Sequence, residues 1–283
     1  MNFSFLVVDS GSTKADWMHY PSEYLFFTRG FNPFYHDVKS IITELSKHED
    51  EFKKFNKINS IYWYGSGCSN EKNKQIISEA LSHFFPNTSI YVEHDLLGAA
   101  RALLGNQKGI ACILGTGSNS CLYDGKQIVH NIPSLGFFLG DEGSAAHISK
   151  NFLRAYFYQQ LLPETSQTFS NEYALERTTF LNKLHQSAEP NLEVAQFTPF
   201  LSKYIHFPDI QRIVKDSFRE FFINQASRYE GFCELPIAFT GSVAVAFQPI
   251  LMEVLKEWNA HFYKTVKNPI HELYNYHLKN IHL

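Results

Sequence analysis

The chain has 283 residues, enough for two modest domains, because a single hydrophobic core rarely grows beyond about 250 residues. Its 25 Lys and Arg against 28 Asp and Glu give a net charge of -3, so no strongly basic field exists to hold nucleic acid or an anionic membrane. With no basic leader and no apolar run near the roughly 18 residues of a membrane span, we expect a cytoplasmic protein with a small-molecule partner.

The chain opens on an apolar run, FSFLVVD (3–9), followed by the small-residue turn SGSTK and a second β-prone run, ADWMHY (15–20). Two such runs around a short turn predict a β-hairpin. A P-loop would instead place its lysine at the start of a helix, and Pro21 follows the second run here.

The rest of the first half alternates between helical and strand patterns. Apolar residues recur at helical spacing in 38–45 and 76–84, and HDLLGAARALL (94–104) is a third expected helix. The runs SIYWYGSG (60–67) and SIYVE (89–93) are expected to be strands. This alternation predicts a mostly parallel sheet covered by helices, hence an α/β protein.

The second half begins with a copy of the first hairpin. GIACIL, GTGSNS and CLYDG (109–125) again read as strand, glycine and hydroxyl turn, and strand, which indicates a duplicated domain. We expect domains at 1–107 and 108–268, and a helix at 269–283 that packs back on the first domain. In the second domain the sequence predicts one strand, PIAFT (236–240). It also predicts four helices there, which run from Ser144 to about 162 and over 173–184, 209–229 and 248–258.

Both hairpin turns suit a polyphosphate, because glycine allows close approach and backbone amides donate to anions. Asp9 could hold a hydrated Mg²⁺ beside the first turn, whereas Lys14 could be either a phosphate ligand or a surface lysine. Asp95 lies where a strand meets a helix, so it could be a ligand-binding carboxylate or only the helix N-cap. The GDEGS run (140–144) could likewise be a functional turn or a helix cap.

Four cysteines, Cys68, Cys112, Cys121 and Cys233, show no CxxC spacing, and we expect structural thiols that are mostly buried.

Taken together, these motifs resemble the sugar kinase, Hsp70 and actin superfamily, and within it the N-acetylglucosamine kinase group, which shares a family with the BadF/BcrA-type ATPases. DSGSTK (9–14) looks like the first phosphate motif, GTGSNS (115–120) like the second, and FTGSVA (239–244) like the adenosine motif. The resemblance implies two ribonuclease H-like, actin-like ATPase domains with a nucleotide cleft between them. It also implies ATP and Mg²⁺ as cofactors, a sugar substrate and a homodimer.

The resemblance implies transfer of the ATP γ-phosphoryl group to a sugar hydroxyl, most simply the 6-OH of an amino sugar such as N-acetylglucosamine. Asp95 would be the catalytic base and Asp9 the residue that holds Mg²⁺ through water. The remaining implied ligands fall into three groups: Ser10, Gly11, Ser12, Thr13, Lys14, Gly115, Thr116 and Gly117 for the phosphates, Gly241 and Ser242 for the adenosine, and Asn32, Asp95, Ser118, Asn119, Gly136 and Asp141 for the sugar.

Two other functions stay open at this point. One is an ATPase that activates a partner enzyme, whose relatives carry cysteines for an iron-sulfur cluster. The other is a regulator that responds to nucleotide or sugar without catalysis. The pair Phe137 and Phe138 also stands where the resemblance leads us to expect residues that recognise an acyl group.

Overall fold

The computed structural model describes residues 3–11, 13–55 and 57–280. By its internal contacts the chain forms two compact units. Unit 1 comprises Met1–Gln107, Gly125–Gln127 and Asn268–Leu283, and unit 2 comprises Lys108–Asp124 and Ile128–Lys267. In the described parts of the chain, no helix is both long and apolar enough to span a membrane.

Unit 1 is built on a five-stranded sheet with the strand order β3-β2-β1-β4-β5. The first three strands are antiparallel neighbours, while β4 and β5 run parallel to β1. The elements are β1 (Phe5–Ser10), β2 (Lys14–Tyr20), β3 (Leu25–Arg29), α1 (Val38–Leu45), α2 (Glu49–Phe52), β4 (Ser60–Gly65), α3 (Glu71–Phe84), β5 (Ser89–His94), α4 (Asp95–Leu104) and α14 (Ile270–Asn280).

Alternation along β1 sends its side chains to two different cores. Leu6 and Val8 pack into the core that includes buried residues of α1 and α3. Phe5 and Val7 pack with buried residues of α14 and with Ala102 of α4. Asp9 has the parity of Val7, so it belongs to the α4 face of the sheet.

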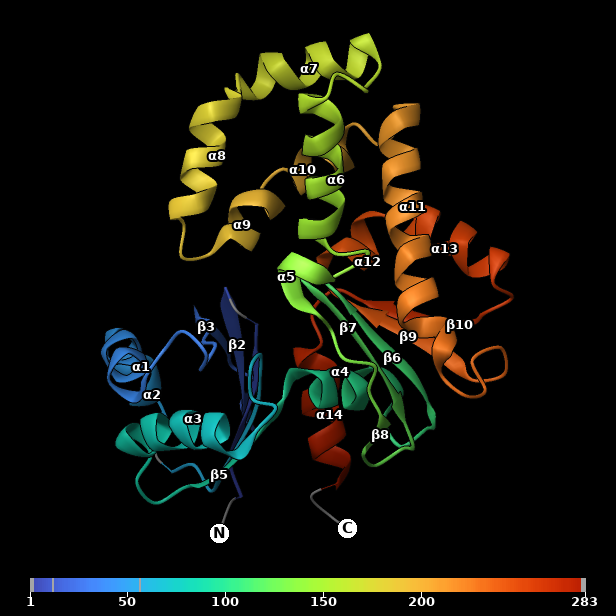
Figure 1. Ribbon diagram of the computed structural model, residues 1–283. Coiled ribbons are helices and arrows are strands. Elements are labelled where there is room, and N and C mark those ends of the chain that lie inside the picture. The colour runs from blue at the N-terminus through green and yellow to red at the C-terminus, as the bar shows by residue number, and fades with distance from the viewer. Residues whose placement is uncertain (1–2, 12, 56, 281–283) are drawn as a thin grey trace. The chain divides into compact units, whose positions relative to one another are not determined.

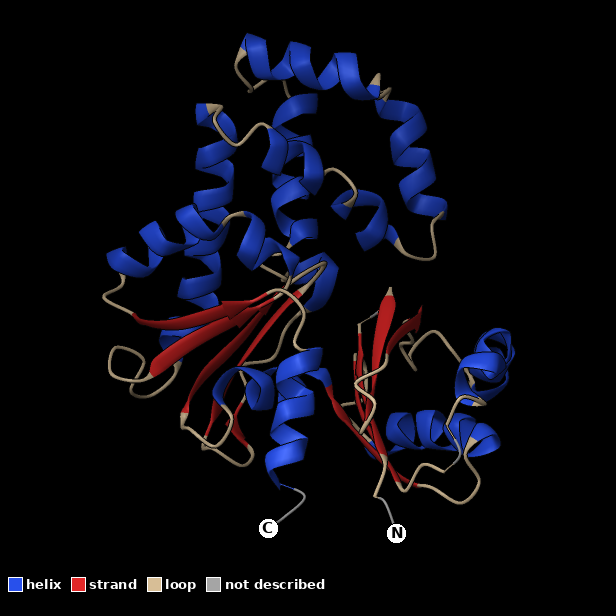
Figure 2. Ribbon diagram, turned by 180° about the vertical axis from the view of Figure 1, so that it is seen from behind, coloured by secondary structure: helices blue, strands red, loops and turns tan. Residues whose placement is uncertain are grey.

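Unit 2 repeats the same strand pattern, with the order β10-β9-β6-β7-β8. β6 is antiparallel to β7 and parallel to β9, which confirms the predicted copy of the first hairpin. Figure 2 shows both sheets in red, each accompanied by helices of its own unit. The strands are β6 (Gly109–Leu114), β7 (Ser118–Tyr123), β8 (Ile128–His130), β9 (Pro236–Thr240) and β10 (His261–Val266).

A long helical insertion separates β8 from β9 in unit 2 (Figure 1). Buried phenylalanines of α6, α7, α10 and α11 form its core together with β6 and β9. The predicted helix over 173–184 is wrong in one respect: α7 ends at Tyr173, Ala174 is left-handed with φ of 43°, and a new helix follows. The helices are α5 (Gly136–Leu139), α6 (Ala145–Phe157), α7 (Pro163–Tyr173), α8 (Arg177–Gln186), α9 (Pro190–Ala195), α10 (Thr198–Lys203), α11 (Pro208–Asn224), α12 (Ser242–Ala246) and α13 (Gln248–Glu257).

Candidate functional site

The β1–β2 turn of unit 1 is tight and mostly exposed. The Gly11 N–H donates to the Lys14 carbonyl at 3.0 Å, and Gly11, Thr13 and Lys14 are all exposed. Ser10 is fully buried, and its hydroxyl accepts from the Phe31 N–H at 3.3 Å. The Ser10 side chain therefore joins this turn to the next loop. Ser12 lies outside the described residues.

An acidic group lies beside this turn on the α4 face of the sheet. Asp9 and Asp16 are direct partners across β1 and β2. Burial, together with the negative charges of Asp16 and Asp95, raises the pKa of Asp9 to about 7, although the positive charge of Lys14 lowers it. Lys14 is not a free surface lysine, because its Nζ forms a salt bridge with Asp16 Oδ1 at 2.7 Å and covers the Phe27 ring. Asp9 and Asp16 form a carboxylate pair, and such a pair can hold a hydrated Mg²⁺ through water. In the described residues, no three His, Cys, Asp or Glu side chains are grouped so that they could bind a metal ion directly.

The raised pKa of Asp9 makes the stability of the metal-free protein depend on pH. The folded state binds the proton of the Asp9 carboxyl group more tightly than the unfolded state does. Protonated Asp9 therefore stabilises the fold below about pH 4, and this stabilisation is lost as pH rises to about 7. We expect chemical unfolding in EDTA to show Asp9→Asn gaining stability over the wild type across this window, by roughly 2–4 kcal/mol. A difference between the two proteins that does not vary with pH would contradict this assignment.

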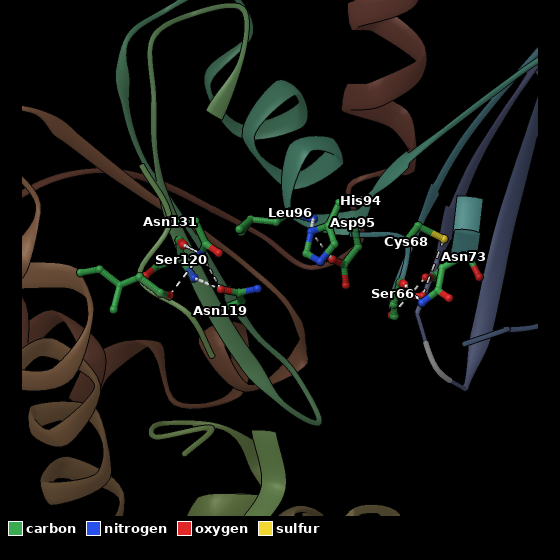
Figure 3. A network of polar contacts seen from close by, with 12 residues as sticks. Ser66, Cys68, Asn73, His94, Asp95, Leu96, Asn119, Ser120 and Asn131 are labelled. Atoms are coloured by element: carbon green, nitrogen blue, oxygen red, sulfur yellow. Dashed lines mark hydrogen bonds and ion pairs between the residues drawn. The ribbon is translucent and has the colours of Figure 1, made fainter. Parts of the chain in front are cut away.

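Asp95 is the first residue of α4, and it is not the N-cap. His94 occupies the cap position with extended backbone, and its Nδ1 accepts from the Leu96 N–H at 3.1 Å. The alternative that Asp95 only caps its own helix is therefore wrong. Figure 3 shows the Asp95 side chain beside the His94 ring, with its carboxylate projecting away from the helix. Both side chains keep a quarter of their surface exposed.

The Asn32 loop is held against the β1–β2 turn. Asn32 Oδ1 accepts from the Phe34 N–H at 3.0 Å, and among the described residues its amide nitrogen has no protein partner. The amide is thus available as a donor to a ligand. Gly30, just before this loop, lies so close to the turn that a Cβ would be 1.9 Å from the Gly11 oxygen and 2.7 Å from the Lys14 nitrogen.

In unit 2, the β6–β7 turn is fixed to the first turn of α6. The N–H groups of Ala145 and Ala146 donate to the carbonyls of Gly115 and Thr116, at 2.8 and 3.2 Å. Within the described chain, the N–H groups of Thr116 and Gly117 have no protein acceptor. Unpaired amides next to glycine form a suitable anion site.

Asp141 lies directly against this second turn. A Cβ on Gly117 would be 3.0 Å from Asp141 Oδ2, a tight contact that glycine avoids. Asp141 Oδ1 accepts from the Ser134 hydroxyl at 2.8 Å and from the Ser118 N–H at 3.3 Å. Burial raises the pKa of Asp141, although these two hydrogen bonds lower it. Its φ of 58° is an uncommon, strained conformation for a residue with a side chain, and such strain concentrates at functional sites.

Two of the other predicted sugar ligands of unit 2 are linked to Asp141, Ser118 directly and Gly136 through the Ser134 hydroxyl. Ser118 is the first residue of β7, and its hydroxyl is buried with no partner among the described residues. Asn119 Oδ1 accepts from the Ser120 N–H and from Asn131 Nδ2 (Figure 3). No other described residue bonds the Asn119 amide nitrogen, which can therefore donate to a ligand. Gly136 begins α5 with φ of 68°, and its N–H donates to the Ser134 hydroxyl.

The predicted adenosine residues lie at the end of β9. Gly241 has φ of 115°, donates to the Val266 carbonyl at 3.1 Å and lies against the Leu114 carbonyl. Ser242 is exposed and begins α12. A cavity of about 460 Å³ adjoins the far end of α12; its lining includes Phe247, Pro249, Arg212 and Lys215.

Sequence reasoning missed several residues that shape these sites. Asp16 could have been found, because a hairpin closed at SGSTK pairs it with Asp9. His94 and Ser134 gave no signal, since each acts through side-chain contacts to an aspartate and to a nearby backbone N–H, which the sequence does not reveal. The signal for Gly30 was its place in a predicted loop, which does not reveal close packing.

A scan of protein-family models and a search of curated proteins find no match. Among solved structures, a proposed N-acetylglucosamine kinase from Porphyromonas gingivalis is 35% identical, with a TM-score of 0.91 over 99% of this chain and 100% of that one. A second proposed N-acetylglucosamine kinase, from Chromobacterium violaceum, is 16% identical, with a TM-score of 0.74 over 97% and 98% of the two chains.

A more distant likeness is the ROK family glucokinase of Streptomyces griseus, solved with glucose and AMPPNP. It is 11% identical, with a TM-score of 0.58 over 95% of this chain and 98% of that one. The two likenesses below 25% identity show a shared fold. They place the two repeated sheets in the α/β fold of actin-like ATPases and sugar kinases, as the motifs predict.

Proposed function

Because this chain belongs to the N-acetylglucosamine kinase-like family of the sugar kinase, Hsp70 and actin superfamily, we propose that it is an ATP-dependent sugar kinase. The observation that carries the proposal is the position of Asp95. It is the first residue of α4, it is free of the helix cap, and its charge acts on Asp9 beside the first phosphate turn. A carboxylate placed there can accept a proton next to a bound phosphate.

We assign ATP phosphate binding to the two hairpin turns. In unit 1 the phosphate ligands would be the exposed residues Gly11, Thr13 and Lys14, together with Ser10 and Ser12. In unit 2 they would be Gly115 and the backbone amides of Thr116 and Gly117, which have no acceptor in the described chain. Gly241 and Ser242 would contact the adenosine. Asp9 would hold Mg²⁺ through water, and the cation would neutralise negative charge on the phosphates.

We assign the sugar to Asn32, Ser118, Asn119, Gly136 and Asp141, which offer amide donors and carboxylate acceptors for hydroxyl groups. Asp95 takes the proton of the attacking hydroxyl, proposed to be the 6-OH. A bond forms between that oxygen and the γ-phosphorus, the bond from this phosphorus to the bridging oxygen breaks, and ADP leaves. Alignment and charge stabilisation lower most of the barrier in such reactions. We place this ATP-consuming reaction in the cytoplasm.

We propose that the acceptor carries an acyl group, as N-acetylglucosamine does. In unit 2 the α5 tip, defined as Leu135, Phe138 and Leu139, is apolar and strongly exposed, with 79% of Phe138 accessible. This tip lies in the same loop as Gly136 and Asp141. An apolar surface beside hydrogen-bonding groups suits a sugar with a methyl-bearing substituent.

Replacing Phe138 with Ser is expected to raise the KM for N-acetylglucosamine about 3- to 10-fold while changing the KM for unsubstituted glucose little, because one small apolar contact contributes about 1 kcal/mol. Steady-state ADP release with both sugars measures the two values. The matched control is Tyr158→Ser, another exposed aromatic of unit 2 outside the proposed site. If the KM values for both sugars change by the same factor, the α5 tip does not recognise the acyl group.

The activator alternative depends on thiolates for an iron-sulfur cluster. Cys112 and Cys121 lie on neighbouring strands inside unit 2, and burial raises the pKa of Cys121 to about 12. A buried neutral thiol is a poor cluster ligand. The homodimer predicted from the resemblance remains a proposal, which sedimentation equilibrium would test.

The kinase proposal is tested by incubating the protein with ATP, Mg²⁺ and a panel of hexoses and N-acylated hexoses. We expect sugar-dependent ADP release with at least one N-acylated hexose. ATP binding without ADP release from any sugar in the panel would favour the regulator alternative.

A further inference from the structure

His94 places one ring nitrogen against two neighbours. Its Nδ1 accepts from the Leu96 N–H at 3.1 Å, which caps α4, and it also lies 3.0 Å from Asp95 Oδ1. Figure 3 shows both contacts at the same edge of the ring. This nitrogen has a single in-plane position for either a lone pair or a proton.

The two contacts require different protonation states. To accept from Leu96, Nδ1 must carry its lone pair, which then faces an acceptor oxygen of Asp95. To donate to the Asp95 carboxylate, Nδ1 must carry a proton, and the Leu96 amide loses its cap. A proton on Oδ1 of Asp95 keeps both contacts, because Nδ1 then accepts from Asp95 and from Leu96, whereas a proton on Nδ1 keeps the contact with Asp95 and gives up the one with Leu96.

We propose that His94 and Asp95 share one proton, and that His94 is a positioning residue for the catalytic carboxylate. This inference rests on the proposed kinase function. When the shared proton moves onto Nδ1 of His94, Asp95 is a carboxylate, and its Oδ2 can accept the proton of the acceptor hydroxyl. After phosphoryl transfer the pair holds two protons and releases one to water, which restores the starting state.

The other titratable groups near Asp95 do not substitute for His94. Asp9 on β1 and the Cys68 thiol after β4 both feel the charge of Asp95, and Glu93 on β5 pairs with Lys74 at 2.9 Å. Burial raises the pKa of Cys68 to about 12, so it stays a neutral thiol. Among the described residues, His94 is the one ionisable side chain within ion-pair distance of the Asp95 carboxylate.

Replacing His94 with Asn separates capping from proton sharing. Asn is a preferred N-cap residue, so the fold and Tm should be kept, but its amide cannot gain or lose a proton near neutral pH. We expect kcat to fall about 100-fold with the KM for ATP within about twofold, since a misplaced base affects the transfer step alone. The dependence of kcat on pH should change shape as well.

The matched control is His83→Asn, the same replacement at an exposed histidine of α3 in unit 1, which should leave kcat unchanged. If His94→Asn keeps the wild-type kcat and pH profile, His94 is only a helix cap and the proposal is wrong. If His94→Asn lowers the Tm strongly, its kcat does not test the proposal, and the NMR experiment below does.

The imidazole ¹⁵N resonances of His94 test the shared proton without any turnover. At one fixed pH, we expect the Nδ1 resonance of the wild type to show a proton shared with Asp95, and that of Asp95→Asn to show only a lone pair. Identical Nδ1 resonances in the two proteins would overturn the proposal. If instead the wild type phosphorylates no sugar but the resonances differ, the kinase function fails while the shared proton stands.

Discussion

Replacing Asp95 with Asn is expected to reduce kcat for sugar phosphorylation by about 10³-fold, within the range seen when a general base is removed. Asn has nearly the same shape, so the α4 start and its His94 cap should be retained. It cannot take the proton of the attacking hydroxyl. ATP affinity, measured by calorimetry, should change little, because Asp95 is not among the residues assigned to the phosphates.

The matched control is Glu71→Gln, at the first residue of α3 in the same unit, which should leave kcat within about twofold. If Asp95→Asn keeps more than a tenth of the wild-type kcat, Asp95 is not the base. If Asp95→Asn also loses ATP binding, the Asp95 charge contributes to nucleotide binding.

Replacing Gly30 with Ala is expected to damage both the fold of unit 1 and ATP binding. The new Cβ would be 1.9 Å from the Gly11 oxygen and 2.7 Å from the Lys14 nitrogen, both backbone atoms that cannot rotate away. Overpacking of this kind costs about 1–3 kcal/mol. The first phosphate turn must shift to relieve it, so we expect ATP affinity to fall about 10-fold or more.

The control for this substitution lies in the same turn. A Cβ on Gly11 would meet only the Lys14 oxygen, at an ordinary 3.6 Å, so Gly11→Ala should keep the wild-type Tm. Equal Tm values for Gly30→Ala and the wild type would show that the two loops do not pack as closely as described.

The sequence predicted the two hairpins because their turn chemistry and apolar runs are local signals. It did not predict β3, β8 or β10, which lie in the outer parts of the sheets and are partly exposed. Edge strands carry a weaker hydrophobic pattern, because one side has no neighbour. The break after Tyr173 was also missed, since left-handed Ala174 gives no glycine or proline signal.

The candidate site shows the same division between local and non-local information. Asp95 and Asp141 could be predicted as candidates because each stands beside a motif. What decides their role depends on side-chain conformation and on non-local contacts. His94 rather than Asp95 caps α4, and Asp141 combines a left-handed backbone with a hydrogen bond from Ser134. Propensity favours Asp over His as a cap, so the sequence alone could not separate the two interpretations.

A single-turnover assay with labelled ATP decides whether this protein is a sugar kinase. The purified protein is mixed in excess with ATP labelled in the γ-phosphoryl group, Mg²⁺ and N-acetylglucosamine, and the products of a single turnover are separated. We predict that the label moves to the 6-position of the sugar in the wild type and stays on ATP in Asp95→Asn. Label released as inorganic phosphate with or without sugar, or label that never leaves bound ATP across a panel of N-acylated hexoses, would contradict this prediction.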